Sequence, residues 1–189
     1  MANYMKYLII LMLSFIFILG CNSIQNNDLE VGYEITSINN LLLDEKDLVE
    51  LDISILNSDC EVNVYETSPT SPLEQDYMCY FNINSYDSEV IIQIQKFTNL
   101  DDLNGTYQYS SSHYRSAEGL ISENEYGDMS RFYRNSEKDY GAEFNDPDVY
   151  FYHLWIVKDK YLILVTSKGS EEAKDTVEAI GLTILSKFE

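Results

Sequence analysis

The sequence has few basic residues. Twelve Lys and Arg stand against 32 Asp and Glu, which gives a formal net charge of −20 at pH 7. A surface with this charge repels nucleic acid and anionic headgroups at long range. The composition therefore predicts a protein that has no nucleic-acid partner and whose acids form a hydrated, self-repelling surface.

The sequence also lacks recognisable catalytic patterns. It contains no Gly-rich phosphate loop, no His-Glu-x-x-His and no EF-hand loop. Its two histidines have no spacing that would suggest a Ser-His-Asp triad. Acids cluster in several places, but 32 acids in 189 residues produce clusters by number alone. We therefore predict no catalytic residue, no metal and no cofactor, and keep a carboxylate-dependent hydrolase and a calcium-stabilised module as alternatives.

Long apolar runs are absent except at the N-terminus. Residues 7–19 read YLIILMLSFIFIL, with Lys6 before them and Gly20-Cys21 after them. A basic start, a short apolar run and a small residue before the cleavage point are the parts of a secretory signal peptide. The run is shorter than the roughly 20 residues that a membrane-spanning helix needs. Residues 1–20 are therefore predicted to be a signal peptide.

The end of this run resembles the lipobox of prokaryotic lipoproteins. Residues 18–21 read Ile-Leu-Gly-Cys, and in that family the cysteine thiol receives a diacylglyceryl group before cleavage leaves the cysteine first. The resemblance implies that Cys21 is lipidated and holds the protein on the extracytoplasmic face of a cell membrane. The alternative is an uncleaved apolar anchor with an incidental cysteine. Residues 21–32 then form the lipidated N-terminus and a flexible tether, and residues 33–189 a single domain.

Two cysteines remain once Cys21 is assigned to lipid. Outside the cytoplasm an even pair favours a disulfide. If the stretches around Cys60 and Cys79 form a hairpin centred on residues 69–70, the two cysteines face each other within bonding range. The alternative is a pair of buried thiols. A metal site is disfavoured, because neither cysteine has a nearby histidine or a Cys-x-x-Cys partner.

Seven segments have the composition or the alternation of strands. In residues 89–97 Val90, Ile92 and Ile94 alternate with polar residues, which is the period of a half-buried strand. Residues 149–157 are apolar on both faces, so this strand should be central and covered on both sides. The predicted strands are 60–66, 76–84, 89–97, 120–126, 129–135, 149–157 and 161–167.

Two segments have helical periodicity. Apolar residues recur at helical spacing over 99–117, and Ala173, Val177 and Ile180 begin an apolar stripe within 170–188. Adjacent strands with interspersed helices predict an α+β fold. Its sheet should be mainly antiparallel, with a central helix (99–117) and a C-terminal helix (170–188) packed on it. We expect both helices on one face.

This layout resembles the small exported domains of the PsbP and Mog1 type. The features that prompt the comparison are the Gly127-Asp128 turn between two strands, the aromatic hairpin at 149–167 and the terminal helix. The resemblance implies an exported domain of unknown activity, with a binding or accessory role.

The arginines are concentrated in a short segment. Arg115, Arg131 and Arg134 lie within 20 residues of each other. Arg131 and Arg134 differ by three positions, so on a strand they point to opposite faces. Arg115, His113 and Arg131 therefore form a possible anion or ligand site, with structural pairing to carboxylates as the alternative. His153, on an aromatic strand, is expected to be a core residue.

Together these features predict a membrane-anchored lipoprotein on the extracytoplasmic side. Its domain would be a non-catalytic ligand-binding, protein-binding or accessory module. Its partners would be the membrane, through the N-terminal lipid, and an envelope protein or a small ligand.

Overall fold

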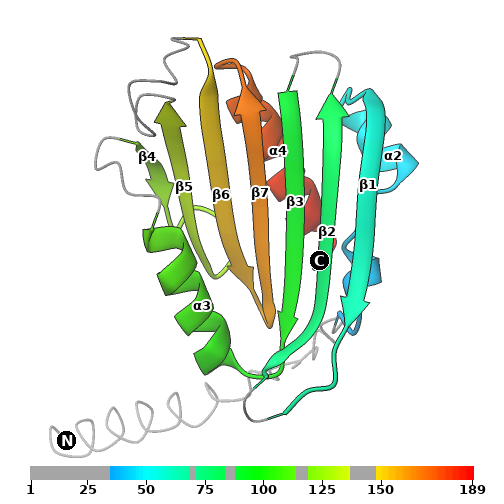
Figure 1. Ribbon diagram of the computed structural model, residues 1–189, viewed down its shortest axis with the longest axis vertical. Coiled ribbons are helices and arrows are strands. Elements are labelled where there is room, and N and C mark those ends of the chain that lie inside the picture. The colour runs from blue at the N-terminus through cyan, green and yellow to red at the C-terminus, as the bar shows by residue number, and fades with distance from the viewer. Residues whose placement is uncertain (1–34, 69–70, 84–87, 114–118, 137–147) are drawn as a thin grey trace, which may run out of the picture. The chain divides into compact units, whose positions relative to one another are not determined.

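The computed structural model describes residues 35–68, 71–83, 88–113, 119–136 and 148–189. Within these ranges the chain forms a seven-stranded sheet with helices packed against it (Figure 1). The predicted signal peptide (1–20) and tether (21–32) lie outside the described residues.

All neighbouring strands of the sheet are antiparallel. Their order is β1-β2-β3-β7-β6-β5-β4, so the hairpin β6–β7 is inserted beside β3 in the middle of the sheet. The α+β prediction with a mainly antiparallel sheet is thus confirmed. The strands are β1 (Ile55–Val64), β2 (Leu73–Ile83), β3 (Ser88–Phe97), β4 (Leu120–Glu123), β5 (Met129–Ser136), β6 (Tyr150–Lys158) and β7 (Tyr161–Gly169).

Four helical segments accompany the sheet. They are η1 (Ile38–Asn40), α2 (Glu45–Glu50), α3 (Leu100–Ser112) and α4 (Ala173–Ser186). The Asn99 side chain caps α3 by accepting a hydrogen bond from the backbone N–H of Asp102 (2.9 Å). The central and C-terminal helices are thus present as predicted, although α3 ends at Ser112 rather than at residue 117. No helix in the described part of the chain is long and apolar enough to cross a bilayer.

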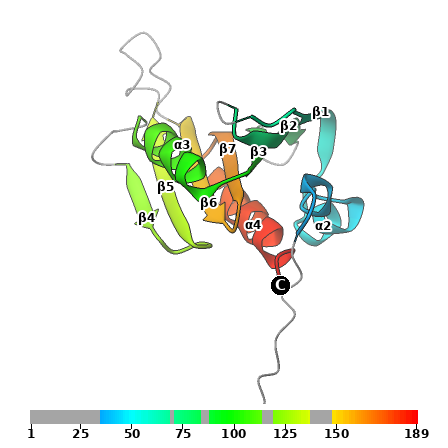
Figure 2. The same ribbon diagram turned by 90° about the horizontal axis from the view of Figure 1, so that it is seen from below.

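The two long helices lie on opposite faces of the sheet (Figure 2). The expectation that both pack on one face is therefore wrong. The reason lies in β6, which is apolar on both sides and needs cover on both. Leu154 and Ile156 belong to the core cluster that contains the buried side of α4. Trp155 and Val157 belong to the smaller cluster that contains the buried side of α3.

The segment before β1 is fastened to the α4 face of the sheet. Ile38 and Leu41 are fully buried in the larger core. The Tyr161 hydroxyl donates to the carbonyl of Ile35 (2.8 Å), and the Lys96 ammonium donates to the carbonyl of Thr36 (2.8 Å). These bonds fix the point at which the N-terminal part of the chain reaches the domain.

The turn between β4 and β5 is locked to the turn between β6 and β7. Gly127 has a φ of +58°, and a Cβ there would lie 2.5 Å from the carbonyl oxygen of Val157. The Asp128 carboxylate accepts hydrogen bonds from the Lys158 ammonium (3.1 Å) and from the backbone N–H of Asp159 (2.8 Å). Only glycine combines this φ with so close an approach.

Candidate functional site

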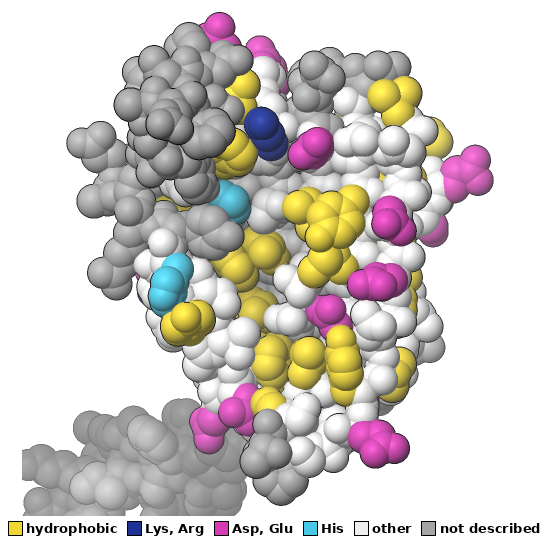
Figure 3. Space-filling view, viewed as in Figure 1, with side chains coloured by type: hydrophobic (Ala, Val, Ile, Leu, Met, Phe, Trp, Pro, Cys, Tyr) yellow, Lys and Arg dark blue, Asp and Glu magenta, His cyan; other side chains and the backbone are white. Residues whose placement is uncertain are grey.

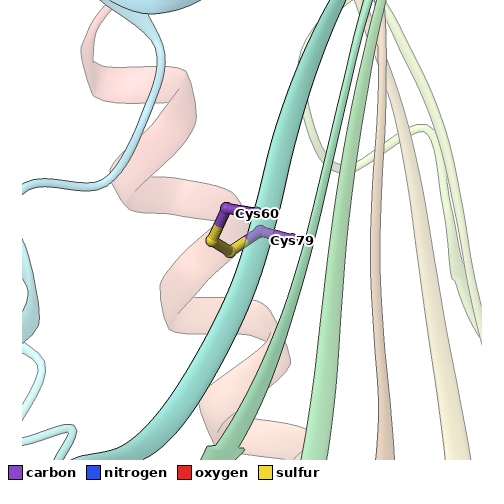
Figure 4. The surroundings of a disulfide bond; sticks show 2 residues. All are labelled: Cys60 and Cys79. Atoms are coloured by element: carbon purple, nitrogen blue, oxygen red, sulfur yellow. A yellow bond between two sulfur atoms is a disulfide. The ribbon is translucent and has the colours of Figure 1, made fainter.

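Cys60 and Cys79 lie directly opposite each other in the β1–β2 ladder, the register that the predicted hairpin requires. Their sulfurs are joined in a disulfide (Figure 4). Cys79 is fully buried, whereas Cys60 belongs to the outermost strand of the sheet. The bond therefore ties an edge strand to its only neighbour. Cys21 lies outside the described residues.

Arg131 holds α3 against β5. Its Nε donates to Glu123 Oε1 (2.9 Å), and its guanidinium also donates to Ser111 Oγ (2.9 Å) and lies 5.4 Å from the ring centre of Tyr107. Burial alone would lower the pKa of Arg131, but the hydrogen bond to Glu123 and the neighbouring Tyr107 and Tyr133 raise it. The donors of Arg131 thus serve a structural contact between a strand and a helix.

The other members of the predicted anion site lie elsewhere or outside the described residues. His113 is exposed at the C-terminal end of α3, with Nδ1 2.6 Å from the carbonyl oxygen of Tyr109 and its ring 4.1 Å from the Tyr109 ring. Arg115 belongs to the undescribed residues 114–118. His113 and Arg131 therefore engage different partners, and the combined anion site with Arg115 stays a prediction.

Arg134 points to the opposite face of β5, as the three-residue spacing predicts. There it lines a cavity of about 280 Å³, which we call the Arg134 cavity. The cavity lies where the β4–β6 edge of the sheet meets the segment that opens α4. Its lining is Gly119, Leu120, Ile121, Arg134, Tyr152, Glu171 and Lys174.

The back of the Arg134 cavity is a buried tyrosine. Tyr152 is 1% exposed, and its hydroxyl donates to the carbonyl of Glu171 (3.2 Å). Burial raises the pKa of Tyr152, and the nearby Arg134 opposes that rise. The guanidinium of Arg134 lies 5.3 Å from the ring centre of Tyr150. Arg134 is thus held beside two tyrosines, through its contact with the Tyr150 ring and through its interaction with the Tyr152 hydroxyl.

The charged side chains around the Arg134 cavity make only one long ion pair with each other. The guanidinium of Arg134 approaches the Glu171 carboxylate to 3.9 Å, compared with 2.9 Å between Arg131 and Glu123. Lys174 makes no ion pair with any described residue. The lining therefore carries two cations and one carboxylate, a net charge of about +1 in a strongly acidic chain.

Sequence reasoning missed this cavity. Arg134 was noted, but Lys174 is the only other basic member and lies 40 positions later, in the helix α4. Both line the cavity because α4 packs on β6 and β7, on the face of the sheet to which Arg134 points. The periodicity of the sequence does not decide which face a helix covers. The available signal was the presence of Lys174 in the first turn of a helix where an acid is usual.

The acidic clusters have structural roles in the described residues. Asp44 and Asp47 form a reciprocal capping box at the start of α2, and Lys187 binds Asp47 at 2.7 Å. Asp101 and Asp102 lie in the first turn of α3, which favours negative charge. In the described ranges no group of three or more His, Cys, Asp or Glu side chains is placed to hold a metal ion.

His153 is buried on the α3 face of β6. It is 8% exposed, and burial lowers its pKa to about 4. The imidazole is therefore neutral at pH 7. The expectation of a core histidine is confirmed, and the residue is too enclosed to meet a solute from the solvent.

A second surface lies on the sheet face beside α3. Figure 3 shows this face, with hydrophobic side chains spread over strands that no described helix covers. Tyr80 is 49% exposed, and Met78, Ile91 and Leu164 are partly exposed. The carboxylate of Asp76, the buried acid of this face, is already bound by Gln93 (3.0 Å). This surface offers apolar contact, whereas the Arg134 cavity adds a surplus positive charge.

Known proteins show no family for this chain and a weak structural likeness. No family model matches the chain, and no curated protein matches it. Among solved structures, the extracellular domain of PknH from Mycobacterium tuberculosis is similar at 10% identity and a TM-score of 0.45, over 79% of this chain and 93% of that one. A likeness at this level leaves the function to be argued from the residues themselves, and the resemblance to the PsbP and Mog1 type stays a prediction.

Proposed function

We propose that the protein is an extracytoplasmic lipoprotein whose domain acts as a non-catalytic binding or accessory module. One observation supports lipid anchoring at Cys21. Of the three cysteines, Cys60 and Cys79 are joined to each other, which leaves Cys21, directly after Gly20 and a charge-free apolar run, as the thiol available for lipid. Two acyl chains on that thiol would hold the protein stably at a membrane, where one chain gives marginal binding.

The distance between anchor and domain suits this proposal. The carbonyls of Ile35 and Thr36, the first described residues, are hydrogen-bonded to side chains of the sheet. The 14 peptide steps from Cys21 to Ile35 span at most about 50 Å when extended. The domain can therefore stand clear of the headgroup layer while it stays attached.

The chemistry of the described residues supports binding rather than hydrolysis. His153 is neutral and enclosed, and His113 is bound to the helix that it ends. Arg131 is committed to a contact between α3 and β5. The Arg134 cavity holds two cations, Arg134 and Lys174, and one carboxylate, Glu171, which approaches Arg134 to 3.9 Å. A lining with a surplus of positive charge is suited to hold an anion.

The anchor is tested by expressing the full chain in a bacterium that processes lipoproteins. We expect the wild type in the membrane fraction, with an intact mass that begins at Cys21 and carries a diacylglyceryl group. Cys21→Ser should lose the lipid mass. Cys60→Ser is the matched control, because it removes a cysteine without touching the anchor and should remain lipidated.

Two results would refute the proposal that lipid on Cys21 anchors the protein. One is a wild-type mass that still contains residues 1–20. The other is a mature chain whose Cys21 sulfur is unmodified.

A further inference from the structure

We infer that the Arg134 cavity binds a small monocarboxylate with a short apolar tail. The inference rests on the binding role proposed above and names the class of ligand. It follows from three properties of the lining, namely its charge, its apolar rim and its size.

The charge of the cavity selects a monoanion. Arg134 and Lys174 supply two positive charges, and Glu171 returns one negative charge. The remaining charge of about +1 matches one carboxylate. A dianion such as phosphate would leave a negative charge beside Glu171, within a chain whose net charge is already −20.

The arginine is arranged to accept a carboxylate. Its guanidinium lies over the Tyr150 ring at 5.3 Å and reaches Glu171 only at 3.9 Å. A guanidinium presents five N–H donors in a planar fork, so donors remain for a carboxylate in addition to the contacts with Tyr152 and Glu171. Lys174, which has no ion-pair partner among the described residues, supplies a second positive charge.

The rim of the cavity is apolar. Leu120 is 45% exposed and Ile121 is 38% exposed, although both are large aliphatic residues. They line the cavity together with Tyr152, which is itself almost fully buried. A short hydrocarbon tail on the ligand would remove this aliphatic surface from water, at about 0.8 kcal/mol for each buried methylene group. The volume of about 280 Å³ accommodates a ligand of this kind but no large molecule.

Hexanoate is a suitable probe, with acetate and hexanamide as controls. Acetate keeps the charge without the tail, and hexanamide keeps the shape without the charge. Binding would be measured by calorimetry on the full lipidated chain in lipid nanodiscs, with empty nanodiscs as the reference. We expect hexanoate to bind at least about tenfold more tightly than either control.

Variants then locate the site. Arg134→Gln and Lys174→Gln should each weaken hexanoate binding by about tenfold. Lys160→Gln is the matched control, because it removes the same charge from an exposed turn outside the cavity lining and should leave binding unchanged. Glu171→Gln should tighten binding, because it removes the competing carboxylate. A variant that merely misfolds would not show this gain.

The inference is overturned if the wild type binds none of the three probes. It is also overturned if hexanamide binds as well as hexanoate, or if Arg134→Gln leaves the affinity unchanged. These outcomes are separate from the test of the anchor, since an unlipidated chain with normal hexanoate binding would refute the anchor alone.

Discussion

His153 shows how burial sets the chemistry of a single residue in this protein. The imidazole lies on the α3 face of the sheet at 8% exposure, and its pKa falls to about 4. In the unfolded chain the same group has a pKa near 6.5. Between these two pH values the unfolded state binds more protons than the native state, so stability is lost as the pH falls.

Replacing His153 should therefore flatten the pH dependence of stability. We expect the free energy of unfolding of the wild type to lose about 3 kcal/mol more than that of His153→Leu between pH 6.5 and pH 4. Urea denaturation at both pH values measures the difference. Parallel slopes for the wild type and His153→Leu would show that His153 protonates without cost.

Single residues were only partly predictable from sequence. The three-residue spacing of Arg131 and Arg134 correctly placed them on opposite faces of a strand. It could not say which of them would meet a cavity, because that depends on which helix covers which face. The partner of Arg131 was equally hidden, since Glu123 reaches it through the β4–β5 register.

The turn between β4 and β5 is the element most dependent on one residue. A side chain at Gly127 would meet the carbonyl oxygen of Val157 at 2.5 Å, and the residue has a φ of +58°. In α3, by contrast, a Cβ built at Gly105 meets nothing within 4 Å. The same substitution should therefore have opposite effects in the two elements.

Gly127→Ala should destabilise the protein by at least about 2 kcal/mol, from backbone strain and the clash together. Gly105→Ala should stabilise it by about 0.5–1 kcal/mol, because alanine loses less conformational entropy in a helix. Chemical denaturation of both variants beside the wild type makes the comparison. A neutral Gly127→Ala would mean that the turn can move away from β6.

Among the elements, strands were easier to predict than the placement of helices. Alternation in β3 and the apolar run in β6 gave the right segments because both signals are local. Which face of the sheet α3 or α4 covers, by contrast, does not depend on the local sequence of the helix. The apolar run of β6 already required cover on both sides, and that requirement was the better guide.

At the scale of the whole molecule, the sheet ends in an exposed edge strand. Among the described strands β1 pairs only with β2, and its Val62 and Val64 are 42% and 72% exposed. An unpaired edge with apolar side chains invites association with other chains. The Cys60–Cys79 bond holds this strand in place from its middle.

Breaking that bond should cost about 3 kcal/mol of stability, by relaxing a loop of 19 residues in the unfolded chain. The expected result is a lower melting temperature for the wild type in reductant. The Cys60→Ala/Cys79→Ala double variant should melt at the lower temperature with or without reductant. Free thiols at both positions in protein isolated from the membrane, without reductant, would contradict the oxidised state.

The hydrogen bonds to Ile35 and Thr36 lie toward one end of the sheet. Lys96 and Tyr161, which hold them, face each other across β3 and β7. Tyr152 of the cavity pairs with Ser167, six positions along β7 from Tyr161, or about 20 Å away. The bonds that hold Ile35 and Thr36 and the Arg134 cavity thus lie toward opposite ends of the sheet. A solute can therefore reach the Arg134 cavity without passing the hydrogen bonds that hold Ile35 and Thr36.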